Sequence, residues 1–372
     1  MIKNAKRKVL ILGNSHLVVF GFRGEIIERL ISEGYEVVVV FPNGPFGEGE
    51  TTSKDYGCKF IEVPINRRGM IPTEEIKLIN RYKKIINAEK PDVVLGFTVK
   101  CNIYGGIACR ITKTPFVANI TGIGKGLAEK GLMQKVIIGL YKIALKKAEH
   151  VYFQNTEDKK FFDTNNIRYK SSKILPGSGV NLTRYSVLPY PSENPIVFTY
   201  IARVMKAKGI ELFLEAANYI KVKYPNTEFH VCGYCEEDYQ KRMEIEQEKG
   251  TIIYHGLVKN IVDYEALSSC VVLPTFHPEG ISNVLLEAAA CGRPVITTDR
   301  AGCRETVDDG VTGFLIKEKS CQDLIDKMEQ FIKISNDDRM KMGLAAREKI
   351  EREFDRQIVV EEYLKIIRTL VS

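Results

Sequence analysis

The sequence predicts two α/β domains in series, each built on a doubly wound parallel sheet. Its 372 residues suffice for two domains, because one domain usually holds about 100–200 residues. Short apolar runs alternate with amphipathic stretches along the chain, and the alternation starts again after Asn194-Pro195. Repeated strand–helix units place helices on both faces of a parallel sheet. Two such series therefore predict two Rossmann-like domains.

The strands follow from the apolar runs, which are continuous, as expected of strands buried on both faces. In the first series we expect strands at 9–12, 36–41, 59–63, 92–96, 116–119 and 150–154. In the second series we expect them at 196–201, 228–231, 252–254, 271–274, 294–297 and 314–316. Helices are predicted between the strands, for example at 22–33, 73–89 and 132–148.

The domain boundary is predicted within residues 188–195, where Pro, Ser and Asn interrupt the helix and strand patterns. Residues 1–187 would then form an N-terminal domain and residues 188–355 a C-terminal domain. We expect residues 356–372 to form a helix that packs back on the N-terminal domain.

Composition excludes several classes of protein. With 44% hydrophobic and 27% charged residues, the chain is typical of soluble globular proteins. It has no run of 18 apolar residues, so no membrane-spanning helix is predicted, and its basic start lacks the apolar region of a signal peptide. We therefore expect a cytoplasmic protein. The nine scattered cysteines indicate reduced thiols, and Cys232 and Cys235 lack the second pair that a zinc site requires.

Charge is distributed unevenly along the chain. Residues 1–186 hold 30 Lys and Arg against 17 Asp and Glu, a net charge of +13, and the remainder has a net charge of −6. A basic half fits nucleic acid, an anionic membrane or a ligand that carries phosphate. No zinc finger or RNP-type aromatic strand is present, so we expect no nucleic-acid partner.

Ligands of doubly wound folds bind at the carboxyl ends of the strands, and we expect them in a cleft between the two domains. No Gly-x-Gly-x-x-Gly follows a strand, and the P-loop pattern is absent. These absences argue against dehydrogenases and NTPases.

Residues 274–294 are the most informative segment and predict strand, loop, helix, turn and strand. Ser282 or Asn283 would cap the helix, which would run to about Cys291, with Gly292 ending it. We expect a diphosphate to bind the N–H groups near the helix start, which belong to Gly280, Ile281, Ser282, Asn283 and Val284.

Two carboxylates and two cations complete the predicted anion site. Glu287 lies one turn into the helix, where it could accept hydrogen bonds from two vicinal hydroxyls, and Glu279 lies in the preceding loop. Arg203 and Lys208 follow the strand at 196–201, and fixed cations there would stabilise a departing diphosphate.

Taken together, three motifs resemble the retaining glycosyltransferase family four, which has the GT-B fold of two facing Rossmann-like domains with a deep cleft. These motifs are Arg203…Lys208-Gly209, Glu279-x7-Glu287 and Thr298-x3-Gly302-x2-Glu305-x4-Gly310-x2-Gly313. Many members have a second glycine after Gly302, where this chain has Cys303.

The resemblance implies roles in a C-terminal, nucleotide-sugar-binding domain. Arg203 and Lys208 would neutralise the donor diphosphate, Glu279 would contact the transferred sugar, and Glu287 would hold the ribose. The remaining donor contacts would come from Gly13, Asn14, Gly233, His255, Gly256 and Leu257, together with the loop from Gly280 to Val284. The chain has no Asp-x-Asp triplet, and we expect no metal and no cofactor beyond a UDP-sugar co-substrate.

The N-terminal half resembles a bacterial branch that extends polyprenyl-diphosphate-linked sugars. The resemblance rests on Phe22-Arg23, on Lys100-Cys-Asn102 and on Asn119-Ile-Thr-Gly-Ile-Gly124. It implies a lipid-linked saccharide as acceptor, with contacts from Ser15, His16, Arg23, Lys100, Asn102, Thr121 and Gly122. The segment Gly13-Asn14-Ser15-His16 stands where many members have a Gly-Gly pair.

The resemblance also implies that the transferred sugar keeps its anomeric configuration. The donor's own diphosphate oxygen would then receive the proton of the acceptor hydroxyl on the same face of the sugar. Two other functions remain open: a nucleotide-sugar epimerase or hydrolase of the same fold, and a binding module without catalysis. We expect the donor to carry a hexose or N-acetylhexosamine.

The predicted helix at 132–147 has apolar side chains at helical spacing, flanked by lysines. The apolar residues are Leu132, Val136, Leu140, Ile143 and Ala144, and the lysines are Lys135, Lys142, Lys146 and Lys147. This stripe could face its own sheet or lie on an anionic membrane surface. With the basic N-terminal half, we expect peripheral binding to the inner face of the cell membrane.

Overall fold

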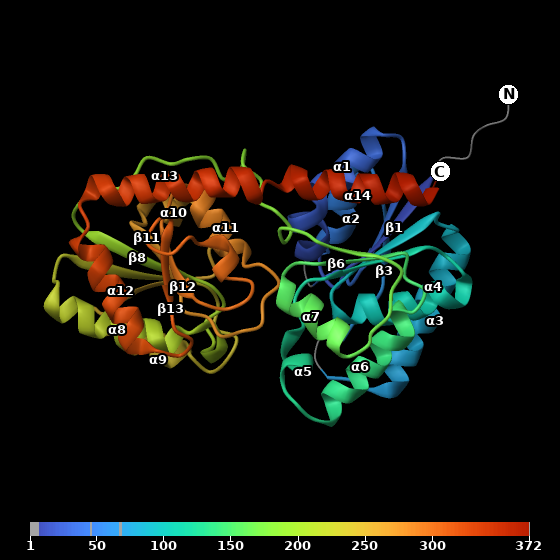
Figure 1. Ribbon diagram of the computed structural model, residues 1–372, viewed down its shortest axis with the longest axis horizontal. Coiled ribbons are helices and arrows are strands. Elements are labelled where there is room, and N and C mark those ends of the chain that lie inside the picture. The colour runs from blue at the N-terminus through green and yellow to red at the C-terminus, as the bar shows by residue number, and fades with distance from the viewer. Residues whose placement is uncertain (1–6, 45–46, 67–68, 372) are drawn as a thin grey trace. The chain divides into compact units, whose positions relative to one another are not determined.

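The computed structural model describes residues 7–44, 47–66 and 69–371 (Figure 1). The chain forms two compact units, one of residues 1–178 and 357–372 and the other of residues 179–356. Residues 179–187 group with the second unit, because Val180 bridges Asp355 and Tyr185 lies in an apolar cluster with Ile350.

The N-terminal unit contains a seven-stranded parallel sheet in the order β3-β2-β1-β4-β5-β6-β7. Its strands are β1 (Lys8–Leu12), β2 (Glu36–Phe41), β3 (Lys59–Glu62), β4 (Val93–Phe97), β5 (Phe116–Ile120), β6 (His150–Phe153) and β7 (Ser172–Ile174). Its helices are α1 (Phe22–Ser32), α2 (Glu48–Tyr56), α3 (Pro72–Glu89), α4 (Gly106–Thr112), α5 (Gly124–Ala128), α6 (Leu132–Leu145), α7 (Thr156–Thr164) and α14 (Arg356–Val371). All six predicted strands are present. The short strand β7 was not predicted, because its three residues lack a buried apolar run.

Helices cover both faces of this sheet. On one face, α3, α4 and α6 pack over Leu10, Val38 and Val94. On the other, α1 and α14 pack over Val9 and Ile11, and the chain therefore returns to its first domain at its end (Figure 1).

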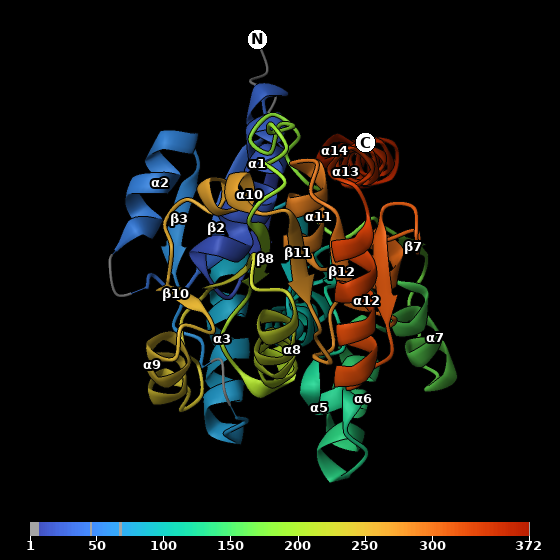
Figure 2. The same cartoon turned by 90° about the vertical axis from the view of Figure 1, so that its left-hand side faces the viewer.

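The C-terminal unit contains a six-stranded parallel sheet in the order β10-β9-β8-β11-β12-β13, each strand close to its predicted place. The strands are β8 (Ile196–Ile201), β9 (Thr227–Cys232), β10 (Ile253–Gly256), β11 (Cys270–Leu273), β12 (Val295–Thr298) and β13 (Gly313–Ile316). The helices are α8 (Ile210–Lys223), α9 (Gln240–Glu248), α10 (Val262–Leu267), α11 (Asn283–Ala290), α12 (Cys321–Lys333) and α13 (Asn336–Glu353). Helices α8 and α12 lie side by side on one face (Figure 2). The fold class predicted from the sequence is confirmed.

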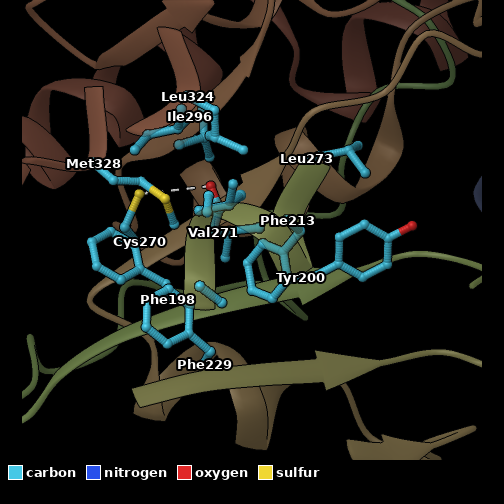
Figure 3. Packing of buried hydrophobic residues seen from close by; sticks show 14 of the residues in the cluster. Phe198, Tyr200, Phe213, Phe229, Cys270, Val271, Leu273, Ile296, Leu324 and Met328 are labelled. Atoms are coloured by element: carbon cyan, nitrogen blue, oxygen red, sulfur yellow. Dashed lines mark hydrogen bonds between the residues drawn. The ribbon is translucent and has the colours of Figure 1, made fainter. Parts of the chain in front are cut away.

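The core of the C-terminal unit is aromatic and aliphatic (Figure 3). Phe198 stacks on Phe229 with ring centres 5.5 Å apart, and Phe213 packs edge-on to Phe229. Val271 and Ile296 from neighbouring strands fill the same layer. This packing fixes the positions at which the parallel strands end, and the candidate site is built from those ends.

Helix α6 exposes three of the five residues of its predicted apolar stripe. The side that packs on the sheet consists of Ile137, Tyr141, Ala144 and Leu145. Of the predicted stripe, Leu132, Val136 and Ile143 are 79%, 43% and 48% exposed. The helix therefore has two apolar sides, and the spacing alone favoured the outer one. In the described part of the chain, no helix has the length and apolar character needed to cross a membrane.

Arg293 is completely buried and holds residues 188–195 on the C-terminal unit. Its Nε donates a hydrogen bond to the carbonyl of Glu265 at 2.7 Å, and its Nη2 donates to the carbonyl of Pro189 at 2.7 Å. The guanidinium also lies over the Tyr190 ring. Arg293 therefore holds residues 188–195, the predicted domain boundary, on the C-terminal unit.

We expect Arg293→Ala to lower the free energy of unfolding by about 3 kcal/mol, because several buried carbonyls lose their donor together. Urea denaturation measures this loss, and Lys333→Ala at an exposed position is the control. A loss below about 1 kcal/mol would contradict the anchoring role.

Candidate active site

The candidate site of the C-terminal unit begins where β8 and β11 end side by side. After β8 the chain passes Arg203, makes a short 3₁₀ turn over Lys206–Lys208 and enters α8 through Gly209. Gly209 has φ +83°, and a Cβ there would come within 2.1 Å of the Pro274 carbonyl oxygen. Only glycine permits this approach, which sets the Lys208 turn against the loop after β11.

Lys208 and Glu279 form an ion pair in that space. The Lys208 ammonium donates a hydrogen bond to Oε1 of Glu279, and both side chains are mostly buried. A Cβ on Gly302 would come within 2.7 Å of the Glu279 carbonyl oxygen, and the Ser282 N–H donates to the Gly302 carbonyl at 2.8 Å. The glycine-containing loop after β12 therefore supports the loop that carries Glu279.

Arg203 lies in the same unit but has a different partner. Its Nη1 donates to Oε2 of Glu236, and the parallel bridge between Val204 and Cys235 brings these two loops together. Sequence reasoning missed Glu236. The position of Glu236 just beyond β9 could have indicated that it lies near Arg203, because β8 and β9 are neighbours in the sheet.

The start of α11 corrects one expectation. Ser282 is the N-cap residue, but no cap hydrogen bond is made by its side chain in the described structure. The first-turn N–H groups of Asn283 and Val284 thus receive no side-chain cap from Ser282, and a helix start of this kind favours anions.

Glu287 faces a buried polar cluster that the sequence did not predict. Tyr185 and the cations Arg184 and Arg356 lie near its carboxylate, and burial raises the pKa of Glu287 to about 7. Beneath it lies Glu265, which is fully buried and accepts a hydrogen bond from the Cys291 thiol at 3.0 Å. Burial raises the pKa of Glu265 to about 8, and the charge of Glu287 adds to the rise.

The predicted nucleobase region lies at the ends of β9 and β10. Gly233 has φ +150°, and a Cβ there would overlap the Ala202 carbonyl oxygen at 1.8 Å. The Gly233 N–H donates to the Gly256 carbonyl at 2.8 Å, and Leu257 is exposed.

His255 packs on two aromatic rings in this region. Its Nε2 lies 3.1 Å from Nδ1 of His230, and its ring centre lies 4.6 Å from that of Tyr264. Burial and the neighbouring His230 lower the pKa of His255. Both neighbours were missed by sequence reasoning.

In the N-terminal unit, the predicted residues gather at the ends of β1, β4 and β5. Gly13, Asn14, Ser15 and His16 follow β1 and lead into a π-helical turn, Leu17–Gly21. The His16 Nε2 lies 2.9 Å from the Thr52 hydroxyl of α2.

Arg23 is buried rather than exposed, with its guanidinium 4.4 Å from the centre of the Phe97 ring. Lys100 pairs with Glu75 of α3 at 2.5 Å. Asn102 is buried as well, and its Nδ2 donates to the Asn119 carbonyl at 2.7 Å.

Thr121 and Gly122 follow β5 directly, and Gly122 has φ +109°. Just beyond β4, Thr98 adopts φ +75°, which is rare for a β-branched residue. A second π-helical turn, Cys101–Gly105, comes next. Strained backbone and π-helical turns are often found at functional sites.

Two doubly wound units, with a charged site at the carboxyl ends of the strands of one of them, define a protein of the GT-B class. Residues 8–155 match the family model described as "Glycosyl transferase 4-like", and residues 189–349 match "Glycosyl transferases group 1". The chain belongs to the group 1 glycosyltransferases and, within them, to the retaining family four.

Curated relatives match almost the whole chain. An N,N'-diacetylbacillosaminyl-diphospho-undecaprenol alpha-1,3-N-acetylgalactosaminyltransferase of Campylobacter jejuni is 26% identical over 97% of this chain and 98% of that protein. The capsular polysaccharide biosynthesis glycosyltransferase CapM of Staphylococcus aureus is 25% identical over 94% of each. Among solved structures, Anabaena HepE in complex with UDP and glucose has a TM-score of 0.79 at 18% identity, over 98% of this chain and 100% of that one.

We expect Glu265→Gln to stabilise the protein increasingly between pH 5 and pH 8. The folded state keeps the proton on Glu265 up to about pH 8, whereas the unfolded state loses it near the ordinary pKa of 4.5. The stability that protonated Glu265 gives the wild-type protein is therefore fully present below pH 4.5. It is lost as the pH rises through 8. Glutamine does not titrate and still accepts the Cys291 hydrogen bond.

Urea denaturation at several pH values measures this difference, which should grow by about 3 kcal/mol from pH 5 to pH 8. Glu248→Gln removes the same charge at an exposed position and serves as control. A difference that stays constant with pH would contradict a protonated Glu265.

Proposed function

We propose that this glycosyltransferase moves a hexose or N-acetylhexosamine from a UDP donor to a hydroxyl of a polyprenyl-diphosphate-linked saccharide. The product would enter a surface polysaccharide or glycan. The observation that carries the proposal is the Lys208–Glu279 pair beside the start of α11, with Arg203 in the same unit. These groups suit the diphosphate of a nucleotide sugar.

The donor and acceptor classes draw support from the relatives. The Campylobacter enzyme is named for an undecaprenol-diphosphate acceptor, and the staphylococcal protein for capsule synthesis. HepE was solved with UDP and glucose. The similarity of this chain to the two curated proteins extends over its N-terminal half, where the acceptor residues are expected.

The proposed chemistry needs positive charge where the donor bond breaks. As the bond between the anomeric carbon and the diphosphate lengthens, negative charge grows on the diphosphate. Lys208 and Arg203 would stabilise this charge, as a divalent metal does in other transferases. The acceptor hydroxyl attacks from the same face and gives its proton to the departing diphosphate oxygen. The first-turn N–H groups of α11 would hold that diphosphate.

Before the donor binds, each of the two cations is paired with a carboxylate, and the donor diphosphate would have to displace that carboxylate. Glu279 and Glu236 keep Lys208 and Arg203 in place, and a diphosphate would compete for them. Once Lys208 turns to the diphosphate, Glu279 would accept hydrogen bonds from the transferred sugar. On the acceptor side, Lys100 with Ser15, His16, Thr121 and Gly122 would contact the lipid-linked diphosphate sugar. Arg23 and Asn102 are buried, and they would position these contacting residues instead of touching the acceptor themselves.

The experiment that tests this function incubates the protein with a panel of UDP-sugars, with and without a polyprenyl-diphosphate disaccharide. We expect product of the mass of one added sugar only when the acceptor is present. Conversion or hydrolysis of the donor at equal rates without acceptor would favour an epimerase or hydrolase instead.

We expect Lys208→Ala and Arg203→Ala each to lower turnover by about 10²-fold, the loss typical of one contact to transition-state charge. Steady-state kinetics on the panel's best donor measures this effect, and Lys241→Ala, an exposed lysine of the same unit, is the control. Turnover within about threefold of wild type in both folded variants would remove these residues from the site.

We expect Glu287→Gln to weaken binding of UDP itself, because the ribose is present in donor and product alike. Glu279→Gln should slow transfer while UDP still binds, because its role concerns the sugar. Calorimetry with UDP compares the two variants. Equal losses of UDP affinity would show that the two roles are wrongly assigned.

A further inference from the structure

Two adjoining cavities open on the α4 and α6 side of the N-terminal unit, near the amino ends of β5 and β6. Their volumes are about 460 Å³ and 350 Å³, and Arg110 lines both of them. Seven cations line the pair: Arg110, Lys113, Lys142, Lys146, Lys147, Arg168 and Lys170. Among the described lining residues, Glu149 is the one acid. We call these cavities the basic pockets.

Most of these charges are not neutralised by the protein. Lys170 donates to both oxygens of Glu149 at 2.6 Å, and Arg110 donates to the Ile143 carbonyl at the end of α6. Within the ranges that the structure describes, the other five cations make no ion pair: Lys113, Lys142, Lys146, Lys147 and Arg168. Other lysines of this unit, such as Lys59 and Lys173, are paired with acids. The basic pockets thus concentrate charge that an external anion would neutralise.

Exposed apolar side chains adjoin the basic pockets. Ile143 lines the smaller pocket and is 48% exposed. Val136 and Leu132 lie seven and eleven residues before it, about two and three helical turns, and are exposed on the same side of α6. We call these three residues the apolar ridge. The apolar ridge belongs to α6, the helix labelled so in Figure 1.

We propose that the basic pockets bind phosphate headgroups of an anionic phospholipid bilayer, while the apolar ridge rests at the boundary of the acyl chains. This inference rests on the proposed function, which places the acceptor lipid in a membrane. A soluble phosphate or nucleotide would satisfy the pockets but leave the apolar ridge in water. A bilayer satisfies both, because it presents anionic headgroups beside hydrocarbon.

The direction of α6 links this surface to the acceptor residues. The helix follows α5, which begins two residues after Gly122, and Gln134 near its start donates a hydrogen bond to the Leu127 carbonyl of α5. It finishes at the basic pockets, beside the start of β6. A bilayer along α6 would therefore extend from the basic pockets to the predicted acceptor edge, where a lipid-linked sugar has to arrive.

Vesicle flotation tests the proposal, with vesicles of phosphatidylcholine alone or with 30% phosphatidylglycerol, at low and at moderate salt. We expect the wild-type protein to bind the anionic vesicles at least tenfold better than the neutral ones. Lys142→Gln, Lys146→Gln and Lys147→Gln together should reduce that binding about tenfold. A matched triple variant of exposed lysines in the C-terminal unit, Lys241→Gln, Lys249→Gln and Lys333→Gln, should change it less than twofold.

A second variant tests the apolar ridge, with Leu132, Val136 and Ile143 all changed to Ser. We expect this variant to bind the anionic vesicles about fivefold more weakly than the wild type. Its melting temperature should be unchanged, because the three replaced side chains are exposed to water in the unbound protein. Equal binding by the wild-type protein and the pocket variant would overturn the proposal. So would equal loss in the matched control, full binding by the ridge variant, or release of the protein from vesicles by millimolar glycerol phosphate.

Turnover of a short-chain, water-soluble acceptor separates this inference from the proposed function. If the pocket variant turns over that acceptor like the wild type but does not float, the headgroup site is supported and catalysis is intact. If no variant and no wild-type protein transfers sugar, the proposed function fails whatever the vesicles show.

Discussion

The Lys208–Glu279 ion pair depends on backbones that approach one another more closely than side chains allow. Gly209 lies against Pro274, and Gly302 lies against the loop that carries Glu279. Gly233 makes a third such approach, to Ala202 at the end of β8. A Cβ at any of the three would come within 2.7 Å of a main-chain oxygen, so a backbone segment would have to shift. These three glycines are therefore the reason that loops from four strands can share one small charged site.

The elements that depend on local pattern were predictable. Buried parallel strands leave continuous apolar runs, and the two series of strands appear where those runs occur. Lys208 and Glu279 were predicted to belong to one anion site, but their direct ion pair was not predicted. The partner of Arg203 was not predicted either, because nothing in the chain near residue 203 indicates which carboxylate the strand order will bring to it.

Burial was the harder quantity to predict. Arg23 fits a solvated cation in the sequence, yet it lies under Phe97 because a planar guanidinium can pack on an aromatic face. Tyr185 lies about a hundred residues from Glu287 and reaches it only through the packing of residues 179–187 on α11 and α13. On α6, two apolar sides share one spacing, and only the neighbouring helices decide which is covered. Each case turns on contacts between segments far apart in the chain.

The return of α14 to the N-terminal sheet has a consequence for the order in which the protein matures on the ribosome. Tyr363, Leu364 and Ile367 belong to the same core as Val9 and Ile11, and the Asn119 amide donates to the Tyr363 hydroxyl. The part of the sheet face that α14 covers thus stays exposed until residues 356–371 have been synthesised. The second unit, by contrast, is contained in a continuous stretch that ends at residue 356. The domain that is synthesised first is therefore the one that is completed last, and a chaperone would meet its uncovered strands throughout translation of the other.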